Sequence, residues 1–189
     1  LWIAFSAYTQ NDQGRSTMWI MNADDGSHAT RLLETNGEIR TLAWSPDGAT
    51  IAYTAFHNEE PYGSPLYTIS SSGGTPIRLI LETASAWKPA WSPDGTRIAF
   101  HMSNSSHDGE IWVVPANGGD VVQLTQASWA SSIHPTWSPD GARIAFSSDR
   151  TGDWQIWTMS SDGSDRRQLT SGGGEAWSPA WSPDGSRIA

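Results

Sequence analysis

Side chains that could carry out catalysis occur in this sequence, but they do not form a known catalytic motif. The five histidines lie at positions 28, 57, 101, 107 and 134, far apart along the chain, and there is no cysteine. The sequence contains no His-Glu-x-x-His, no Gly-x-Ser-x-Gly and no phosphate-binding loop. Most serines stand in turn-like segments, where the hydroxyl group fixes the backbone. We therefore expect a protein that is not an enzyme.

Acidic side chains gather in three polar segments that have the composition of loops. Carboxylates on loops suit Ca²⁺, which prefers oxygen ligands. None of the three segments has the spacing of a known calcium loop, so we expect solvated surface charge and no cofactor. The acidic residues and the histidines beside them are His57, Glu59, Glu60, His107, Asp108, Asp149 and Asp153.

Other side chains are better suited to binding a ligand than to reacting with one. Several tryptophans and cations stand in segments that lead into a recurring Trp-Ser-Pro-Asp-Gly motif, and exposed Trp and Arg often anchor recognition. Two interpretations stay open: an aromatic pocket for a peptide or sugar, or an aromatic plug between sheets. The candidate binding residues are Arg40, His57, Glu59, Glu60, Tyr62, Trp87, Lys88, His107, Asp108, Trp129, His134, Arg150, Asp153, Trp154 and Trp177.

The composition argues against two classes of partner. The chain has 11 Lys+Arg against 20 Asp+Glu, a formal net charge of −9, so it repels the phosphates of nucleic acids. Uninterrupted apolar runs reach only a few residues, and we expect no membrane insertion. The 12 tryptophans, 18 glycines and 11 prolines favour a β-rich protein with many turns and aromatic packing between sheets.

A repeated motif organises the whole sequence into one domain, residues 1–189. The motif Ala/Thr-Trp-Ser-Pro-Asp-Gly, called the signature below, occurs four times, and its tryptophans are 47, 46 and 44 residues apart. An Ile-Ala pair follows each signature at a constant distance. Repeats of about 46 residues are typical of β-propeller blades. The signatures occupy residues 43–48, 90–95, 136–141 and 180–185.

Each repeat contains four short strand-like segments. The first ends at the signature Trp, the second contains Ile-Ala, the third has an aromatic residue between aliphatic ones, and the fourth surrounds a Leu. The sequence thus predicts an all-β propeller of four four-stranded antiparallel blades. Two ways of completing the propeller ring remain possible. The C-terminal strand could complete the N-terminal blade, or the chain could be part of a larger ring, as a fragment or as one copy in a homo-oligomer.

Segment lengths predict which end of the blades varies. From the signature Trp to the following Ala there are 8 residues in every repeat, whereas the segment between the second and third strands differs in length. In an antiparallel blade the constant turns share one end and the variable loops share the other. We expect ligands at the variable end, because binding residues favour loops on a rigid scaffold.

The signature residues are expected to be structural. A Trp packed between blades and an Asp that fixes a Pro-Asp-Gly turn each serve the scaffold. These residues are Trp44, Trp91, Trp137, Trp181, Asp47, Asp94, Asp140 and Asp184.

Taken together, these runs resemble the TolB-type, WD40-like β-propeller repeat family. Residues 179–189 (Pro-Ala-Trp-Ser-Pro-Asp-Gly-Ser-Arg-Ile-Ala) and 146–153 (Phe-Ser-Ser-Asp-Arg-Thr-Gly-Asp) carry the resemblance, which extends over essentially all 189 residues. Its periplasmic member TolB resembles a six-bladed propeller, whereas the repeats here number four, so we expect a different member. The resemblance implies a periplasmic or extracellular location.

We expect a non-catalytic scaffold that binds a protein or peptide through the variable loops and the mouth of the channel. Two alternatives stay open. One is a propeller that gates substrate access in a larger enzyme, as in prolyl-oligopeptidase-like proteases. The other is an engineered or excised repeat array without a native ligand.

Overall fold

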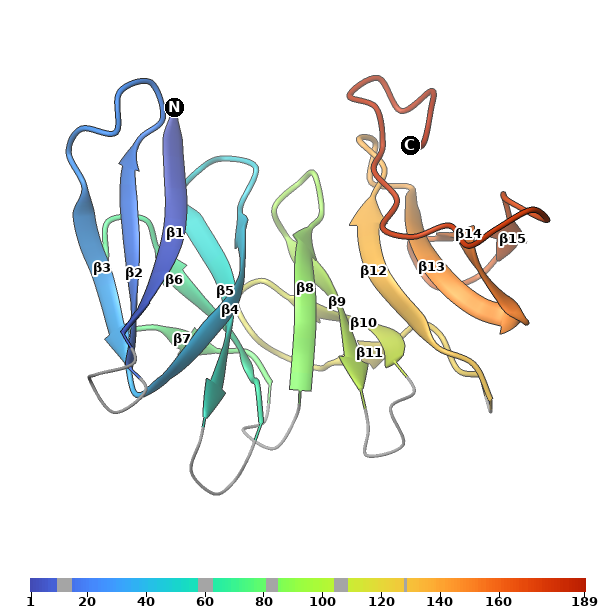
Figure 1. The fold of residues 1–189 in the computed structure, drawn as a ribbon, viewed down its shortest axis with the longest axis horizontal. Coiled ribbons are helices and arrows are strands. Elements are labelled where there is room, and N and C mark those ends of the chain that lie inside the picture. The colour runs from blue at the N-terminus through green and yellow to red at the C-terminus, as the bar shows by residue number, and fades with distance from the viewer. Residues whose placement is uncertain (10–14, 58–62, 81–84, 104–108, 128) are drawn as a thin grey trace.

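The computed structural model describes residues 1–9, 15–57, 63–80, 85–103, 109–127 and 129–189. Strands and turns account for all regular structure in these ranges, and none of them contains a helix, so no helix there could cross a membrane. The strands form four antiparallel sheets that follow one another along the chain (Figure 1). The predicted all-β class and the four antiparallel blades are confirmed, and among the described residues the first blade contains three strands instead of the expected four.

Each sheet corresponds to one blade, and its strands are adjacent in the order of the sequence. The first sheet contains β1 (Trp2–Thr9), β2 (Arg15–Asn22) and β3 (Thr30–Thr35). The second contains β4 (Gly37–Trp44), β5 (Thr50–His57), β6 (Leu66–Ser70) and β7 (Ile77–Arg78). The third contains β8 (Ser85–Trp91), β9 (Arg97–Ser103), β10 (Gly109–Pro115) and β11 (Val122–Gln123). The fourth contains β12 (Ser132–Trp137), β13 (Arg143–Thr151), β14 (Asp153–Ser160) and β15 (Arg167–Gln168).

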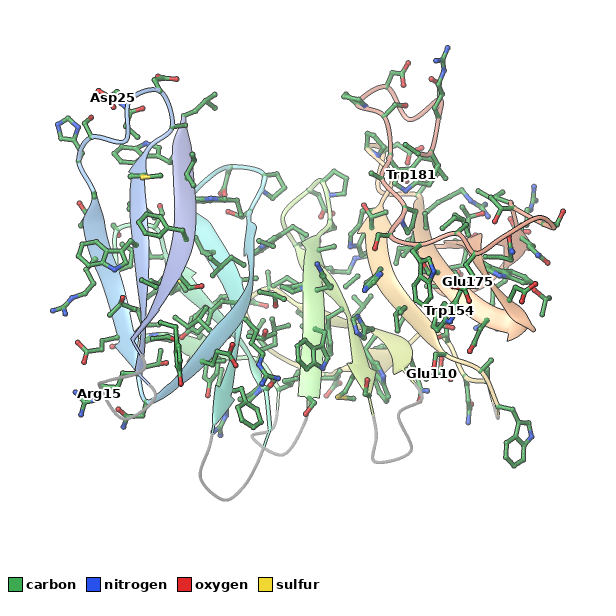
Figure 2. All side chains as sticks on the ribbon, in the orientation of Figure 1. Arg15, Asp25, Glu110, Trp154, Glu175 and Trp181 are labelled. Carbon is green, nitrogen blue, oxygen red and sulfur yellow. The ribbon has the colours of Figure 1, made fainter. Side chains whose placement is uncertain are left out.

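The sheets have two different ends. The signature turns lie at the upper end in Figure 1, where Asp25 and Trp181 are labelled in Figure 2, and Arg15 and Glu110 mark the lower end. In the first signature turn, the Ser45 hydroxyl donates to Asp47 Oδ1 at 2.6 Å, and Asp47 Oδ1 also accepts from Ala49 N at 3.0 Å. The same pair of bonds occurs in the other three signatures. These bonds favour the ionised carboxylate, so the Ser92 hydroxyl and its neighbours lower the pKa of Asp94 to about 2.

The last three signature tryptophans each bond to the repeat before their own. Trp91 Nε1 donates to the carbonyl oxygen of Ala43 at 3.0 Å, and Trp137 Nε1 donates to that of Ala90 at 3.1 Å. Trp181 Nε1 makes the same bond to Thr136 at 3.3 Å. Each acceptor residue immediately precedes the signature Trp of its own repeat, so the same hydrogen bond recurs between successive repeats.

The apolar core is divided among the interfaces between neighbouring sheets. Three clusters of buried side chains each combine residues of two successive sheets. Phe100 and Phe146, both with no exposed surface, occupy equivalent places in the third and fourth sheets. A single sheet has no such core of its own, and stacking the sheets provides one.

The two ends of the row are not joined to each other. β1 pairs with β2 only, and Trp181 forms an isolated antiparallel bridge with Ile188. Figure 1 shows the N-terminal end at β1 and the C-terminal end, beyond the fourth sheet, apart from each other. Closure by pairing the C-terminal strand with the first sheet, one of the two alternatives, is therefore not observed, and the four sheets form an open, partial propeller.

Some strand boundaries differ from those expected. The fourth strands β7, β11 and β15 contain only two residues each and end before the Leu that was expected at their centre. The expected loop around Gly152 is a tight hairpin, in which Thr151 pairs with Asp153. Gly152 has a φ of 107°, a conformation that glycine adopts without a steric penalty, and it is the one residue between the paired Thr151 and Asp153.

Gly163 is a point where two sheets approach closely. A Cβ atom added to Gly163 would lie 2.8 Å from the carbonyl oxygen of Leu124 in the preceding sheet, and its φ is 86°. We expect Gly163→Ala to lower the free energy of unfolding by about 2 kcal/mol, through overpacking as well as backbone strain. Gly172→Ala is the matched control, since φ there is 76° and nothing lies within 4 Å. Equal losses in urea melts of the two variants would contradict the close approach.

Candidate functional site

The innermost strands of the last three sheets carry bulges that turn side chains toward one another. The pairing shifts by one residue after Ile39 in β4, after Trp87 in β8 and after Ile133 in β12. Lys88 and His134 occupy the bulges of β8 and β12, with φ values of 50° and 55°. Such left-handed conformations are uncommon for residues other than glycine.

Proline explains why these bulges are left-handed. Lys88 and His134 are each followed by proline, as is Ser178, whose φ is 52°. Proline disfavours the right-handed helical conformation in the residue before it, which an ordinary bulge would use. Arg40, at the β4 bulge, is followed by Thr41 and does not have a positive φ. Strained residues of this kind cost about 1–3 kcal/mol each and cluster at functional sites.

The bulges open onto one shared pocket, called the bulge pocket below. Its volume is about 390 Å³, and it is lined by residues of four repeats. None of the described residues that line it is acidic, although the chain as a whole carries a charge of −9. The lining residues are Arg40, Thr41, Leu42, Lys88, Pro89, His134, Pro135, Ser178 and Pro179.

Beside the bulge pocket, ring systems and one guanidinium group follow each other from sheet to sheet. The Arg40 guanidinium lies 4.3 Å from the ring centre of Phe56 and 4.9 Å from that of Trp87, so it stacks on both. His101 is the strand partner of Trp87 in the third sheet, which places both side chains on one face.

The row continues into the fourth sheet. The rings of His101 and His134 are 5.6 Å apart, and those of His134 and Trp177 are 6.5 Å apart. Trp177 stacks on Trp154 at 4.2 Å, and Figure 2 shows Trp154 near Glu175, which accepts a hydrogen bond from Trp177 Nε1. We call this row the axial belt. It consists of Phe56, Arg40, Trp87, His101, His134, Trp177 and Trp154.

The two belt histidines are held in the neutral form. Burial is the main cause that lowers the pKa of His101 to about 3, and His134 and Lys88 lower it further. Burial and Lys88 also lower the pKa of His134. The Nδ1 atom of His101 is buried and has no hydrogen-bonding partner, whereas His134 Nδ1 lies 2.8 Å from the Ser178 hydroxyl oxygen. Neutral imidazoles can each donate and accept one hydrogen bond.

The candidates named from the sequence divide into three groups. The structure brings together Arg40, Trp87, Lys88, His134, Trp154 and Trp177. These residues were expected in loops and connections, but Arg40, Trp87, Lys88 and His134 lie within the innermost strands, and Trp154 lies in β14. Bulges explain the difference, because a strand can continue through them. Glu59, Glu60, Tyr62, His107, Asp108 and the side chain of His57 lie outside the described residues.

The remaining candidates lie apart from the axial belt. The Arg150 guanidinium stacks 4.8 Å from the Trp157 ring and donates to the hydroxyls of Ser148 and Ser132, so it is a packed side chain. Trp129 is 95% exposed. Asp153 begins β14, and Asp149 Oδ1 accepts a hydrogen bond from Ser131 N.

Metal binding finds no support in the described ranges, which contain no group of three metal-binding side chains.

Sequence reasoning missed Phe56, His101 and Ser178. Ser178 could have been found, because Lys88-Pro89, His134-Pro135 and Ser178-Pro179 each stand three residues before a signature Trp. Phe56 and His101 had no such signal. Their roles depend on contacts with a neighbouring strand or sheet.

Comparison with solved structures shows which proteins share this architecture. TolB from Acinetobacter baumannii superposes with a TM-score of 0.78 at 26% identity, over 100% of this chain and 46% of that one. A putative TolB from Agrobacterium tumefaciens superposes with a TM-score of 0.76 at 24% identity, over 100% of this chain and 68% of that one. A prolyl endopeptidase superposes with a TM-score of 0.66 at 17% identity, over 92% of this chain and 30% of that one. At this identity the similarity concerns the fold alone.

The chain thus spans less than half the length of the Acinetobacter protein. No curated protein sequence matches it. The family model of the TolB beta propeller domain, however, matches residues 2–189, in agreement with the four sheets and the signature turns. The chain belongs to the TolB beta propeller domain family.

Proposed function

We propose that this propeller segment is a non-catalytic binding module that recognises a peptide segment of a partner protein along the axial belt. The observation that carries the proposal is the stack of Trp154 on Trp177, because Trp177 is 44% exposed although it is held from two sides. An exposed aromatic ring that is already fixed loses little conformational entropy when a ligand covers it. Trp is also among the residues most enriched in energetic hot spots.

The composition of the axial belt suits a peptide ligand. It runs across three successive sheets, each of which contributes rings or cations from its inner strands. An extended peptide could stack apolar side chains on Trp177 and Trp87 and place polar groups in the bulge pocket. We also propose a periplasmic or extracellular location, which the membership in the TolB family supports.

Selection from a random peptide library on the immobilised chain tests the proposal. Peptides enriched on the wild-type chain are expected to lose about tenfold or more in affinity on the Trp177→Ala variant, since truncating a hot spot has effects of this size. Val122→Ala is the matched control, because Val122 is 53% exposed on the outer strand β11. Equal affinity for the wild-type and Trp177→Ala chains, or no enrichment at all, would exclude the axial belt as the binding surface.

A further inference from the structure

Lys88 is the only lysine in the sequence, and it lies in the bulge pocket. Its side chain is exposed, and among the described residues no carboxylate lies within ion-pair distance of it. Every other cation of the chain is an arginine. The backbone at Lys88 is strained, and it holds an unpaired ammonium group at a pocket of an otherwise acidic protein. This arrangement indicates a ligand with a negative charge.

The groups around Lys88 define how much charge the pocket can accept. Arg40 is the second cation, but its Nε atom is 3.0 Å from Glu38 Oε2, so this carboxylate already balances one positive charge. His134 and His101 are neutral, because burial and Lys88 lower the pKa of each. Among the described residues, the lining of the pocket together with Glu38 therefore carries a net charge of about one positive unit at neutral pH.

The hydrogen-bonding groups of the pocket are mostly side-chain donors. Pro89, Pro135 and Pro179 line the wall without an amide N–H, since proline has none. The Lys88 ammonium group, the His134–Ser178 pair and the unoccupied positions of the Arg40 guanidinium remain to bind a ligand. Stacking between Phe56 and Trp87 fixes the orientation of that guanidinium.

We propose that the bulge pocket binds a carboxylate group of the peptide that lies along the axial belt, an inference that rests on the proposed function. A carboxylate carries one negative charge, which matches the single uncompensated positive charge. A phosphate group carries close to two, and Glu38 would repel the excess. The carboxylate accepts from Lys88 and from the His134–Ser178 pair, while neighbouring residues of the peptide stack on Trp87 and Trp177. It comes from an Asp or Glu side chain or from a free C-terminus.

Four pools of random heptapeptides distinguish these sources. Three pools have both ends capped and carry Glu, Gln or Lys at the central position, and the fourth carries Gln with a free C-terminal carboxylate. Binding is followed on the whole chain after reductive methylation with ¹³C-formaldehyde, because Lys88 then gives the only side-chain amine signal. The Lys88→Arg variant identifies that signal by its loss.

The Glu pool or the free-carboxylate pool is expected to bind about tenfold more tightly than the capped Gln pool and to shift the Lys88 signal. Lys88→Gln should remove this preference, and Lys88→Arg should retain it. Arg31→Gln is the matched control, since it removes the same charge from the exposed strand β3. Thermal melts verify that each variant is folded.

The outcomes separate the two proposals. If the capped Gln pool binds and the carboxylate pools bind no more tightly, the carboxylate inference is wrong and the peptide-binding function stands. If the Lys pool is preferred, the inference is also wrong. If no pool binds, both proposals fail.

Discussion

Trp137→Ala is expected to unfold or aggregate the protein at room temperature. Trp137 is 6% exposed and belongs to the cluster between the third and fourth sheets, and Arg97 stacks 4.7 Å from its ring. Truncating a buried Trp costs about 3–5 kcal/mol, and the hydrogen bond to Ala90 is lost as well. Domains of this size have a total stability of about 5–15 kcal/mol, so one substitution removes a large part of it.

Chemical denaturation followed by circular dichroism measures this loss. Trp129→Ala is the control, because Trp129 is 95% exposed and its removal should change the free energy of unfolding by less than about 0.5 kcal/mol. Each variant lacks one tryptophan, which changes its fluorescence, so circular dichroism is used to follow unfolding. A Trp137→Ala variant that unfolds at the same denaturant concentration as the wild type would show that the signature Trp does not hold neighbouring sheets together.

Acidification is expected to destabilise the fold through His101. The pKa of His101 is about 3 in the folded chain, mainly because of burial, and about 6.5 in an unfolded chain. Below pH 6.5 the unfolded state therefore binds a proton that the folded state does not, and stability falls as the pH falls toward 3. Linkage gives a loss of about 3 kcal/mol between pH 8 and pH 4. His134 adds to the loss, since its pKa is lowered too.

Urea unfolding at a series of pH values is the measurement. The His101→Gln variant has no imidazole at this position, so its stability should decrease much less between pH 6.5 and pH 5, where ordinary carboxylates stay ionised. His28→Gln is the control, because His28 is exposed in a turn at the upper end. Parallel pH profiles for the wild type and His101→Gln would contradict the burial of a neutral imidazole.

Local regularity explains why the fold could be predicted. The signature encodes a turn whose Ser, Asp and Gly satisfy one another within six residues, as Ser45 and Asp47 do, so the sequence around it is sufficient. The tryptophan interface was also predictable, because an indole recurring every 44–47 residues has to pack against the neighbouring repeat.

The site could be predicted only in part. Trp87, Trp177 and Lys88 could be named because they are aromatic or cationic residues in the segments that lead into a signature. The convergence of His101 with His134 depends on how two sheets are stacked, and nothing local in either strand specifies it. The left-handed bulges are local, but they place inside strands the side chains that were expected in connections before a signature.

The repeated bond from an indole to the preceding sheet gives the molecule a direction. From the second sheet onward, each sheet supplies the carbonyl acceptor for the signature indole of the next repeat, so disturbance at one blade passes first to its immediate neighbours. Amide protons should consequently exchange in a gradient, slowest in the middle two blades and fastest at the extremities. The axial belt spans both zones, and its Trp154–Trp177 stack belongs to the faster one, where a bound peptide would bring the greatest gain in protection.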